Sequence, residues 1–338
     1  MNLYRCLLLI LCLQIVVSCT NSTLNKPQTY NQEALGTYLS MTFFADEQFD
    51  LSKKVDSTIT AINQSMSTYI PTSDISKINK GSVIKVDHMF QENFMKSKEI
   101  YEITNGYFDP TVGLLVNYYG LGPEKYNLEV NDANTDSLMQ YVGFNKVKLD
   151  QQQQIIKSHP SVFLDFNAIA KGYAVDRIGV LLEQLGINNY IIDIGGEILA
   201  KGTNLERDGS WKVGIDRPSE GNTERAYDYI LSLNNKAIAT SGNYRKFNEE
   251  ESGEKYVHTI NPKTGQSEKS DILSASVIAN DCMTADAFAT AFMSMGFERS
   301  LEVFNGLDDI EVLFIYIDDE NEIQSFVSEG LKSKLEKI

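Results

Sequence analysis

Residues 164–176 read Leu-Asp-Phe-Asn-Ala-Ile-Ala-Lys-Gly-Tyr-Ala-Val-Asp and lead a strand directly into a helix. Apolar side chains recur at helical spacing over 168–185, which predicts a helix there. Asp165 and Asn167 are residue types that cap helix starts. Capping does not explain Lys171, a cation in a small, apolar first turn beside free N–H groups that suit a phosphate. A capped helix start and a phosphate-binding helix start are therefore both open.

Around this stretch, helices and strands follow one another without regular alternation. Apolar spacing predicts further helices over 46–67, 90–104 and 284–295. Gly195-Gly196 is typical of a tight turn between two strands. The strand-like segments are 190–193, 197–200, 211–215, 227–233, 237–240, 256–257, 274–279 and 312–317. This mixed order favours the α+β class over a doubly wound parallel sheet.

The length and charge of the chain limit its domain organisation and its partners. The 338 residues are 42% hydrophobic, and no repeat, long linker or second membrane span interrupts 32–338, which predicts one large domain there. The 30 Lys and Arg against 46 Asp and Glu give a net charge of −16. Nucleic acid is excluded as a partner, because phosphate backbones require clustered cations. An acidic protein that binds an anion needs a metal, backbone N–H groups or a few placed cations.

The first residues are typical of an export signal. Arg5 precedes the apolar run 6–17, which is too short to span a bilayer comfortably. Val-Val-Ser-Cys at 16–19 resembles a lipobox, so 1–18 are expected to be a lipoprotein signal peptide and Cys19 the lipidated residue. Residues 19–31 are then a flexible tether. The expected location is the cell envelope, anchored at the periplasmic face of the inner membrane; the alternative is an ordinary cleaved signal with a chance cysteine.

The cysteines agree with export and lipidation. Cys6 and Cys12 leave with the signal and Cys19 is acylated, so Cys282 is left alone and no disulfide can form. A lone cysteine of this kind is expected to be a small buried hydrophobe.

Common catalytic motifs are missing from the sequence. It has no phosphate-binding loop ending in Gly-Lys-Ser/Thr, no Gly-x-Gly-x-x-Gly after a strand and no Gly-x-Ser-x-Gly. His88, His159 and His258 are the three histidines, too few for the usual zinc clusters.

Two further segments combine special residues with apolar neighbours. Residues 106–111 read Gly-Tyr-Phe-Asp-Pro-Thr, and a plain turn held by Asp and Thr would explain them. Residues 239–245 and 258–265 carry small hydroxyl residues and glycines that permit close backbone approach to a ligand. His258 begins the second of these loops, where either a structural or a functional histidine is possible.

The segment 284–291, Thr-Ala-Asp-Ala-Phe-Ala-Thr-Ala, places Asp286 and Thr290 on one helix face. A carboxylate buried without a partner costs several kcal/mol. A hard cation with oxygen ligands, such as Mg²⁺, would resolve that cost. The alternative is an exposed Asp on an Ala-rich surface helix.

Taken in chain order, the segments 106–111, 164–176, 239–265 and 284–291 resemble the ApbE family of FAD:protein FMN transferases. The similarity extends from Leu35-Gly36-Thr37 through 66–69 and 73–79 to the Ala-Asp-Ala helix. The resemblance implies a single large ApbE-like, T-fold-like domain. It also implies a metal bound by Asp286, Thr290 and the backbone carbonyl of Ala168. That carbonyl can ligate only if no intrahelical bond uses it, so the regular helix should start later than 168.

The resemblance further implies which residues line the FAD site. Leu35 stands where Met is often found in the family. The implied lining residues are Leu35, Ser67, Thr68, Tyr69, Phe108, Asp109, Pro110, Asp165, Lys171, His258, Thr259 and Ile260.

The implied reaction is Mg²⁺-dependent transfer of FMN from FAD to a Thr or Ser hydroxyl of an acceptor protein, with release of AMP. Lys171 would stabilise charge on the phosphates, and either His258 or Asp286 would accept the hydroxyl proton. The family's acceptors carry an Asp-x-x-Ser/Thr-Gly-Ala/Ser-Thr type of motif, which implies a subunit of a membrane redox complex as partner. The alternatives are a Mg²⁺-dependent FAD pyrophosphatase and a non-catalytic FAD-binding lipoprotein.

Overall fold

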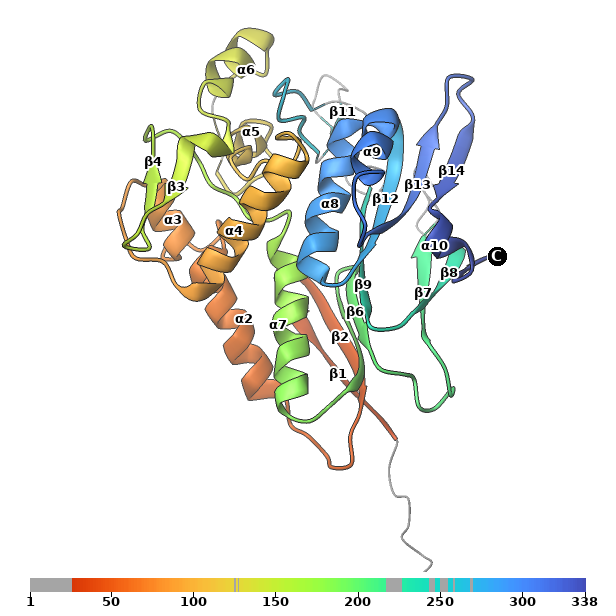
Figure 1. Ribbon diagram of the computed structural model, residues 1–338. Coiled ribbons are helices and arrows are strands. Elements are labelled where there is room, and N and C mark those ends of the chain that lie inside the picture. The colour runs from red at the N-terminus through yellow and green to blue at the C-terminus, as the bar shows by residue number, and fades with distance from the viewer. Residues whose placement is uncertain are drawn as a thin grey trace, which may run out of the picture.

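The computed structural model describes residues 26–124, 126, 128–216, 227–242, 247–249, 255–257, 259–267 and 270–338. Their centre is an eight-stranded sheet with the order β1-β2-β5-β6-β9-β12-β13-β14, in which every neighbouring pair is antiparallel (Figure 1). Its strands are β1 (Pro27–Ala34), β2 (Thr37–Phe44), β5 (Asn189–Ile194), β6 (Glu197–Lys201), β9 (Lys236–Gly242), β12 (Ile272–Ala279), β13 (Glu311–Ile317) and β14 (Ile323–Val327).

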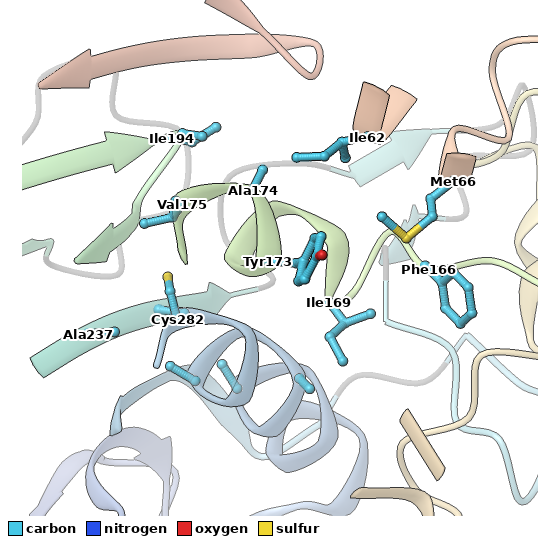
Figure 2. Close-up of a cluster of buried hydrophobic side chains, with 14 of the residues drawn as sticks. Ile62, Met66, Phe166, Ile169, Tyr173, Ala174, Val175, Ile194, Ala237 and Cys282 are labelled. Atoms are coloured by element: carbon cyan, nitrogen blue, oxygen red, sulfur yellow. The ribbon is translucent and has the colours of Figure 1, made fainter. Parts of the chain in front are cut away.

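Helices cover one face of this sheet (Figure 1). The four longest are α2 (Ser52–Met66), α4 (His88–Ile103), α7 (Ala170–Gln184) and α8 (Cys282–Met295). They bury the main hydrophobic core against the sheet, and Figure 2 shows Tyr173 and Ala174 of α7 between Ile62 of α2 and Cys282 of α8. Cys282 is the predicted buried hydrophobe, fully buried and unpaired.

The other face of the sheet is covered by a second, three-stranded sheet of order β15-β8-β7. Its strands are β7 (Trp211–Asp216), β8 (Tyr227–Leu233) and β15 (Leu335–Lys337). Because successive side chains of a strand point to opposite faces, Phe43 of β2 joins the main core while Phe44 packs on Trp211. The two faces of the central sheet are therefore both buried.

Smaller elements complete the described part of the chain. They are α3 (Asp74–Asn79), α5 (Gly113–Tyr118), α6 (Asp132–Met139), η1 (Phe144–Lys146), β3 (Val147–Leu149), β4 (Ile155–Lys157), β10 (Phe247–Glu249), β11 (Lys255–Val257), α9 (Phe297–Phe304) and α10 (Glu329–Lys332).

The predicted class is confirmed, because mixed helices and antiparallel strands form one domain. The four predicted helices and the eight predicted strands are all present. The helix predicted over 46–67 begins only at Ser52, since 46–51 form bends and irregular structure.

The tether predicted over 19–31 extends too far toward the C-terminus. Pro27–Asn31 lie in β1, where they pair with Ser40–Phe44 of β2, so the folded domain begins before residue 32. Residues 1–25, including Cys19, lie outside the described residues. No helix in the described ranges is both long and apolar enough to cross a bilayer.

Close packing of α7 on α8 depends on a glycine. A Cβ atom at Gly172 would lie 2.3 Å from the carbonyl oxygen of Cys282 and 2.9 Å from the Cβ of Asp286. Any larger residue there would force the two helices apart.

We predict that Gly172→Ala lowers the free energy of unfolding by about 1–3 kcal/mol, the usual cost of overpacking a tight contact. Urea denaturation measures the loss. Gly209→Ala is the matched control, because its nearest neighbour is 3.8 Å away and its backbone is not left-handed. Equal stability of the two variants would contradict the tight contact.

Candidate active site at the start of α7

Asp286 is the buried centre of the candidate site. It lies in α8 with 3% of its surface exposed, so it is not an Asp on a surface helix. Its Oδ2 accepts a hydrogen bond of 3.0 Å from the backbone N–H of Gly172 in α7. Burial raises the pKa of Asp286, and the nearby Lys171 acts in the opposite direction. A buried carboxylate with a single backbone donor favours binding of a further cation.

The first turn of α7 leaves a backbone carbonyl free. In a regular helix the Gly172 N–H would donate to the carbonyl of Ala168, four residues earlier. It donates to Asp286 instead, and the first backbone bond into α7 runs from Tyr173 N to Ile169 O at 3.0 Å. Ile169 has φ −147° and ψ −26°, outside the helical region. Within the described chain no backbone N–H donates to the Ala168 carbonyl, and the predicted late helix start is confirmed.

Thr290 lies one turn beyond Asp286 on the same face of α8. Its hydroxyl is 3.4 Å from the hydroxyl of Ser241 in β9. The neighbouring Thr240 is 2.8 Å from the Ser276 hydroxyl in β12. Ser241 therefore reaches α8, whereas Thr240 bonds within the sheet.

Lys171 forms an ion pair that the sequence did not predict. Its Nζ is 2.5 Å from Oε1 of Glu197, the first residue of β6. Glu197 is 4% exposed, and its Oε2 has no hydrogen-bond partner among the described residues. Burial and the charge of Asp286 raise the pKa of Glu197 to about 7, although Lys171 opposes them. Burial alone would lower the pKa of Lys171, but the charges of Asp286 and Glu197 outweigh it.

Asp165 joins two of the predicted segments. Its backbone N–H donates to the carbonyl of Pro110 at 2.8 Å. Its carboxylate accepts from the backbone and side chain of Asn167 at 2.7 and 3.1 Å, within a turn that precedes the helix. The capping interpretation is wrong, because the N-cap of α7 is Ile169 and no side chain caps it. Burial raises the pKa of Asp165 to about 6.

Asn79 of α3 holds this segment in place by two bonds of 2.8 Å to the backbone of Leu164. The strand predicted to lead into the helix is wrong, because the segment forms only an isolated bridge between Phe163 and Val112.

Asp109 holds a turn within 106–111. Its carboxylate accepts from the backbone and hydroxyl of Thr111 at 2.8 and 2.6 Å and from the backbone of Phe144 at 3.2 Å. Burial raises its pKa to about 6. The turn interpretation is therefore confirmed for this side chain, and a flavin contact of Asp109 stays a prediction.

Leu35 and Tyr69 lie in turns, where Leu35 packs partly buried against the main core and Tyr69 is exposed. Leu35 has φ +52° and Gly36 has φ +74° at the hairpin of β1 and β2. A left-handed conformation costs a non-glycine residue roughly 1–2 kcal/mol, so this turn holds Leu35 against its preference. Tyr69 is 60% exposed, and burial of part of the ring together with nearby Asp165 raises its pKa.

The other predicted lining residues are more buried. Ser67 ends α2, and its carbonyl accepts a 2.6 Å bond from the Ser73 hydroxyl. Thr68 has a buried hydroxyl without a partner in the described part of the chain. Phe108 and Pro110 are buried, Thr259 is partly buried, and Ile260 packs with Leu115, Tyr118 and Tyr119 in a small cluster. His258 lies outside the described residues.

Asp176 is a second residue that the sequence interpretation missed. Its two carboxylate oxygens accept the backbone N–H groups of Cys282 and Met283, each at 2.8 Å. Asp281 caps the same helix end through a 2.7 Å bond from Thr284 N. The sequence did contain a signal for this contact, because Asp176 is an acid one helical turn after Gly172 and lies on the same face of α7. Asp176 thereby fixes the start of α8 against α7.

The described residues contain no cluster of three or more His, Cys, Asp or Glu side chains able to hold a metal. A metal at this site would need mixed oxygen ligands: a carboxylate, a hydroxyl and a backbone carbonyl. Asp286, Thr290 and Ala168 offer that set, and oxygen ligands of this kind suit Mg²⁺.

We predict a pH-dependent effect of Asp176→Asn. Burial, and then the charges of Asp281 and Asp286, raise the pKa of Asp176 from 3.8 to about 7. A raised acid stabilises the fold in its protonated form, so this stability is complete below about pH 4 and is lost as the pH rises through about 7. Asn never ionises, so the variant lacks this dependence.

The difference in unfolding free energy between the wild type and Asp176→Asn should therefore change between about pH 4 and about pH 7, where the wild type loses the stability of its protonated acid. At the lower pH the variant should lose about 1 kcal/mol, because Asn offers one acceptor for two N–H groups. Urea denaturation at several pH values measures the difference. A difference that is constant with pH would contradict the raised pKa.

Comparison with known proteins identifies the family of the chain. The model of the ApbE family matches residues 35–314. The chain is 34% identical over 259 residues to an FAD:protein FMN transferase of Haemophilus influenzae, covering 74% of each chain. It is 33% identical over 314 residues to an FAD:protein FMN transferase of Vibrio cholerae, covering 91% of this chain and 90% of the relative.

The fold agrees with these sequence matches. The solved structure of the flavin transferase ApbE from Vibrio cholerae superposes with a TM-score of 0.82 at 29% identity, over 91% of this chain and 99% of that one. Because the family match spans most of the folded domain and the architecture is shared, the chain belongs to the ApbE family.

Proposed function

We propose that this protein transfers FMN from FAD to a Ser or Thr hydroxyl of an acceptor protein, in a Mg²⁺-dependent reaction that releases AMP. The relatives named FAD:protein FMN transferase support the reaction. One observation of the structure carries the metal dependence: the Gly172 N–H binds buried Asp286 and thereby leaves the Ala168 carbonyl free.

The donor groups at the start of α7 fit a hard cation. Asp286 supplies a buried charged oxygen and Thr290 a hydroxyl with a long 3.4 Å contact. Ala168 supplies a carbonyl to which no backbone N–H of the described residues donates. A bound Mg²⁺ would neutralise charge on the pyrophosphate of FAD and act as a Lewis acid. We assign Asp286, Thr290 and Ala168 as its protein ligands.

Residues of the chain would then orient and stabilise the reacting groups. Lys171, held by Glu197, places a cation beside Asp286, where phosphate charge would increase during the reaction. The acceptor hydroxyl oxygen forms a bond to the FMN-side phosphorus, and the bond from that phosphorus to the AMP oxygen breaks. The hydroxyl proton passes to Asp286 or to His258, and the electron pair leaves with AMP.

We propose that FAD lies against the segments which converge near Asp165. Pro110 ties Asp165 to the turn 106–111, and Asn79 ties the neighbouring Leu164 to α3. The proposed lining residues are Leu35, Ser67, Thr68, Tyr69, Phe108, Asp109, Pro110, Asp165, Lys171, His258, Thr259 and Ile260.

We also propose that the protein is exported and anchored through a lipid on Cys19, with a subunit of a membrane redox complex as acceptor. The sequence of residues 1–19 supports the anchor. The intact mass of the membrane-extracted protein tests it, because cleavage before Cys19 and acylation change the mass together.

A Mg²⁺-dependent FAD pyrophosphatase would use the same metal ligands, with water replacing the acceptor hydroxyl. A non-catalytic FAD-binding lipoprotein would not require them. The products separate the three functions: an acceptor heavier by FMN less water, free FMN with AMP, or unconsumed FAD.

We predict that Asp286→Ala abolishes FMN transfer, because it removes the only charged ligand of the proposed metal site. The test mixes enzyme, FAD and Mg²⁺ with a peptide that contains Asp-x-x-Thr-Gly-Ala-Thr and reads the intact mass of the peptide. Thr290→Val should reduce transfer in a way that excess Mg²⁺ partly restores.

Thr284→Val is the matched control on the same helix. The Thr284 hydroxyl is buried and has no partner in the described chain, so its loss should leave both folding and transfer near wild type. FMN transfer by Asp286→Ala at the wild-type rate would refute the proposed metal site.

A further inference from the structure

Residues 73–79, Ser-Asp-Ile-Ser-Lys-Ile-Asn, belong to the family resemblance but contribute no predicted lining residue. They form the short helix α3 together with its N-cap Ser73, whose hydroxyl accepts a 3.2 Å hydrogen bond from the backbone N–H of Ser76. Ile75 and Ile78 are buried in the main hydrophobic core. Because this helix is fixed by its own packing, its two ends can hold other segments in place.

The start of α3 is bound to the stretch that follows α2. The Ser73 hydroxyl donates a 2.6 Å hydrogen bond to the carbonyl of Ser67. Gln64 of α2 donates a bond of the same length to the carbonyl of Thr72, just before the helix. Residues 67–69 are proposed to line the FAD site, so α3 is attached to one side of that site.

The end of α3 is bound to the segment that leads into α7. The side-chain amide of Asn79 donates to the carbonyl of Leu164 and accepts from the Leu164 backbone N–H, each at 2.8 Å. Two residues that face each other in a hydrogen-bonded antiparallel pair exchange the same two bonds. Asn79 thus takes the place of a neighbouring strand for Leu164, a fully buried residue that lies in no strand of its own.

Lys157 joins the same two segments. Its Nζ donates to the backbone carbonyls of Asn79, Pro160 and Val162 at 3.0, 2.8 and 2.8 Å. A charged donor forms stronger hydrogen bonds than a neutral one. The ammonium therefore holds the end of α3 against the residues that come just before Leu164.

The segment between Leu164 and α7 has no regular structure to fix it. Residues 164–169 form neither a strand nor a helix. Asn79 holds this segment at Leu164, and the carbonyl of Pro110 accepts the next N–H, that of Asp165, at 2.8 Å. Contacts with distant parts of the chain therefore fix its position.

Ala168 lies in the turn at the end of this segment, four residues after Leu164. The N–H groups of Ile169 and Ala170 donate to the carbonyl of Phe166 at 3.0 and 2.8 Å, which closes the turn around Ala168. A shift of Leu164 would therefore move the Ala168 carbonyl as well. Binding of Mg²⁺ is sensitive to such shifts, because this ion requires near-ideal octahedral geometry with oxygen atoms at about 2.0–2.1 Å.

We propose that Asn79 is a positioning residue of the metal site, because its amide holds Leu164 and thereby places the Ala168 carbonyl for the cation. The inference rests on the proposed function and adds to it a residue that acts only through the backbone of Leu164. It also gives the motif 73–79 a role, since α3 then joins the stretch 67–69 to the segment that carries the Ala168 carbonyl.

Metal affinity in the absence of FAD and acceptor tests the proposal. Asn79→Ala removes both bonds to Leu164 and should weaken Mn²⁺ binding about tenfold, the usual effect of losing a group that orients a metal ligand. Electron paramagnetic resonance of free Mn²⁺ in a titration of the full-length protein measures the affinity. Lys157→Met, which removes the ammonium from a side chain of similar length, should weaken binding in the same direction.

Asn189→Ala provides the same substitution away from the site. Asn189 Oδ1 accepts a 2.9 Å hydrogen bond from the backbone N–H of Thr203, so this side chain also holds a separate segment. Asn189 begins β5, roughly 17 Å along that strand from the turn before Glu197. The variant should lose stability to urea, as Asn79→Ala does, but bind Mn²⁺ as tightly as the wild type.

Two results would overturn the proposal. One is an equal Mn²⁺ affinity of Asn79→Ala and the wild type. The other is an equal loss of affinity in Asn79→Ala and Asn189→Ala, because lower stability alone would then explain the effect. If Asn79→Ala does not fold, Lys157→Met decides the proposal through the same two comparisons.

Failure of the proposed function has a separate signature. A wild type that binds Mn²⁺ but modifies no acceptor peptide would refute the transferase assignment, and the Mn²⁺ comparison would still decide the role of Asn79. A wild type that binds no Mn²⁺ would refute the metal site and the proposal together. Where transfer does occur, excess Mg²⁺ should restore most of the activity of Asn79→Ala, because the variant keeps every proposed metal ligand.

Discussion

The hydrogen bond from Gly172 N–H to Asp286 is the interaction on which the candidate site depends. The Gly172 N–H donates to a buried carboxylate in α8 and not to the carbonyl four residues earlier in its own chain segment. One contact therefore joins the two helices, supplies a donor to a buried acid and leaves the Ala168 carbonyl without its helical partner. A regular first turn would have satisfied the carbonyl and left Asp286 without the hydrogen bond from Gly172.

The surrounding structure keeps this contact in place. Gly172 has no side chain to separate the helices, and Asp176 holds the start of α8 one turn further along. Around it, burial raises the pKa values of three acids, Asp286, Glu197 and Asp176, and the charge of Lys171 opposes this shift for Asp286 and Glu197. An excess of buried acid over cation is costly in a folded protein. A metal ion at Asp286 would relieve that cost, which gives a physical reason for a cation at this place.

The sequence predicted the helices and strands in which apolar residues recur regularly at the helical or strand period. The helices around Ile178 and Phe288 and the hairpin at Gly195-Gly196 follow from periodicity and turn residues. It missed β1 and β2, because polar residues such as Gln28, Gln32 and Asn31 make β1 look like a solvated tether, and pairing with β2 decides its structure.

The residues of the candidate site also fall into those that the sequence predicted and those that it missed. Asp286, Thr290 and Ala168 follow from the helix face and the family resemblance, and the late start of α7 agrees with them. Glu197 and Asp176 were missed, because each acts through a contact with a residue far away in sequence, Lys171 and Cys282 respectively. Spacing along one helix or strand gives no information about such contacts.

The most direct test of the central claim is an anomalous-scattering map of crystals grown with Mn²⁺ in place of Mg²⁺, since both ions prefer oxygen ligands. We predict one strong peak in direct contact with the Asp286 carboxylate, the Thr290 hydroxyl and the Ala168 carbonyl, at about 2.0–2.2 Å from each. A well-ordered peak that excludes the Ala168 carbonyl, or no peak at Asp286 under saturating Mn²⁺, would contradict the account.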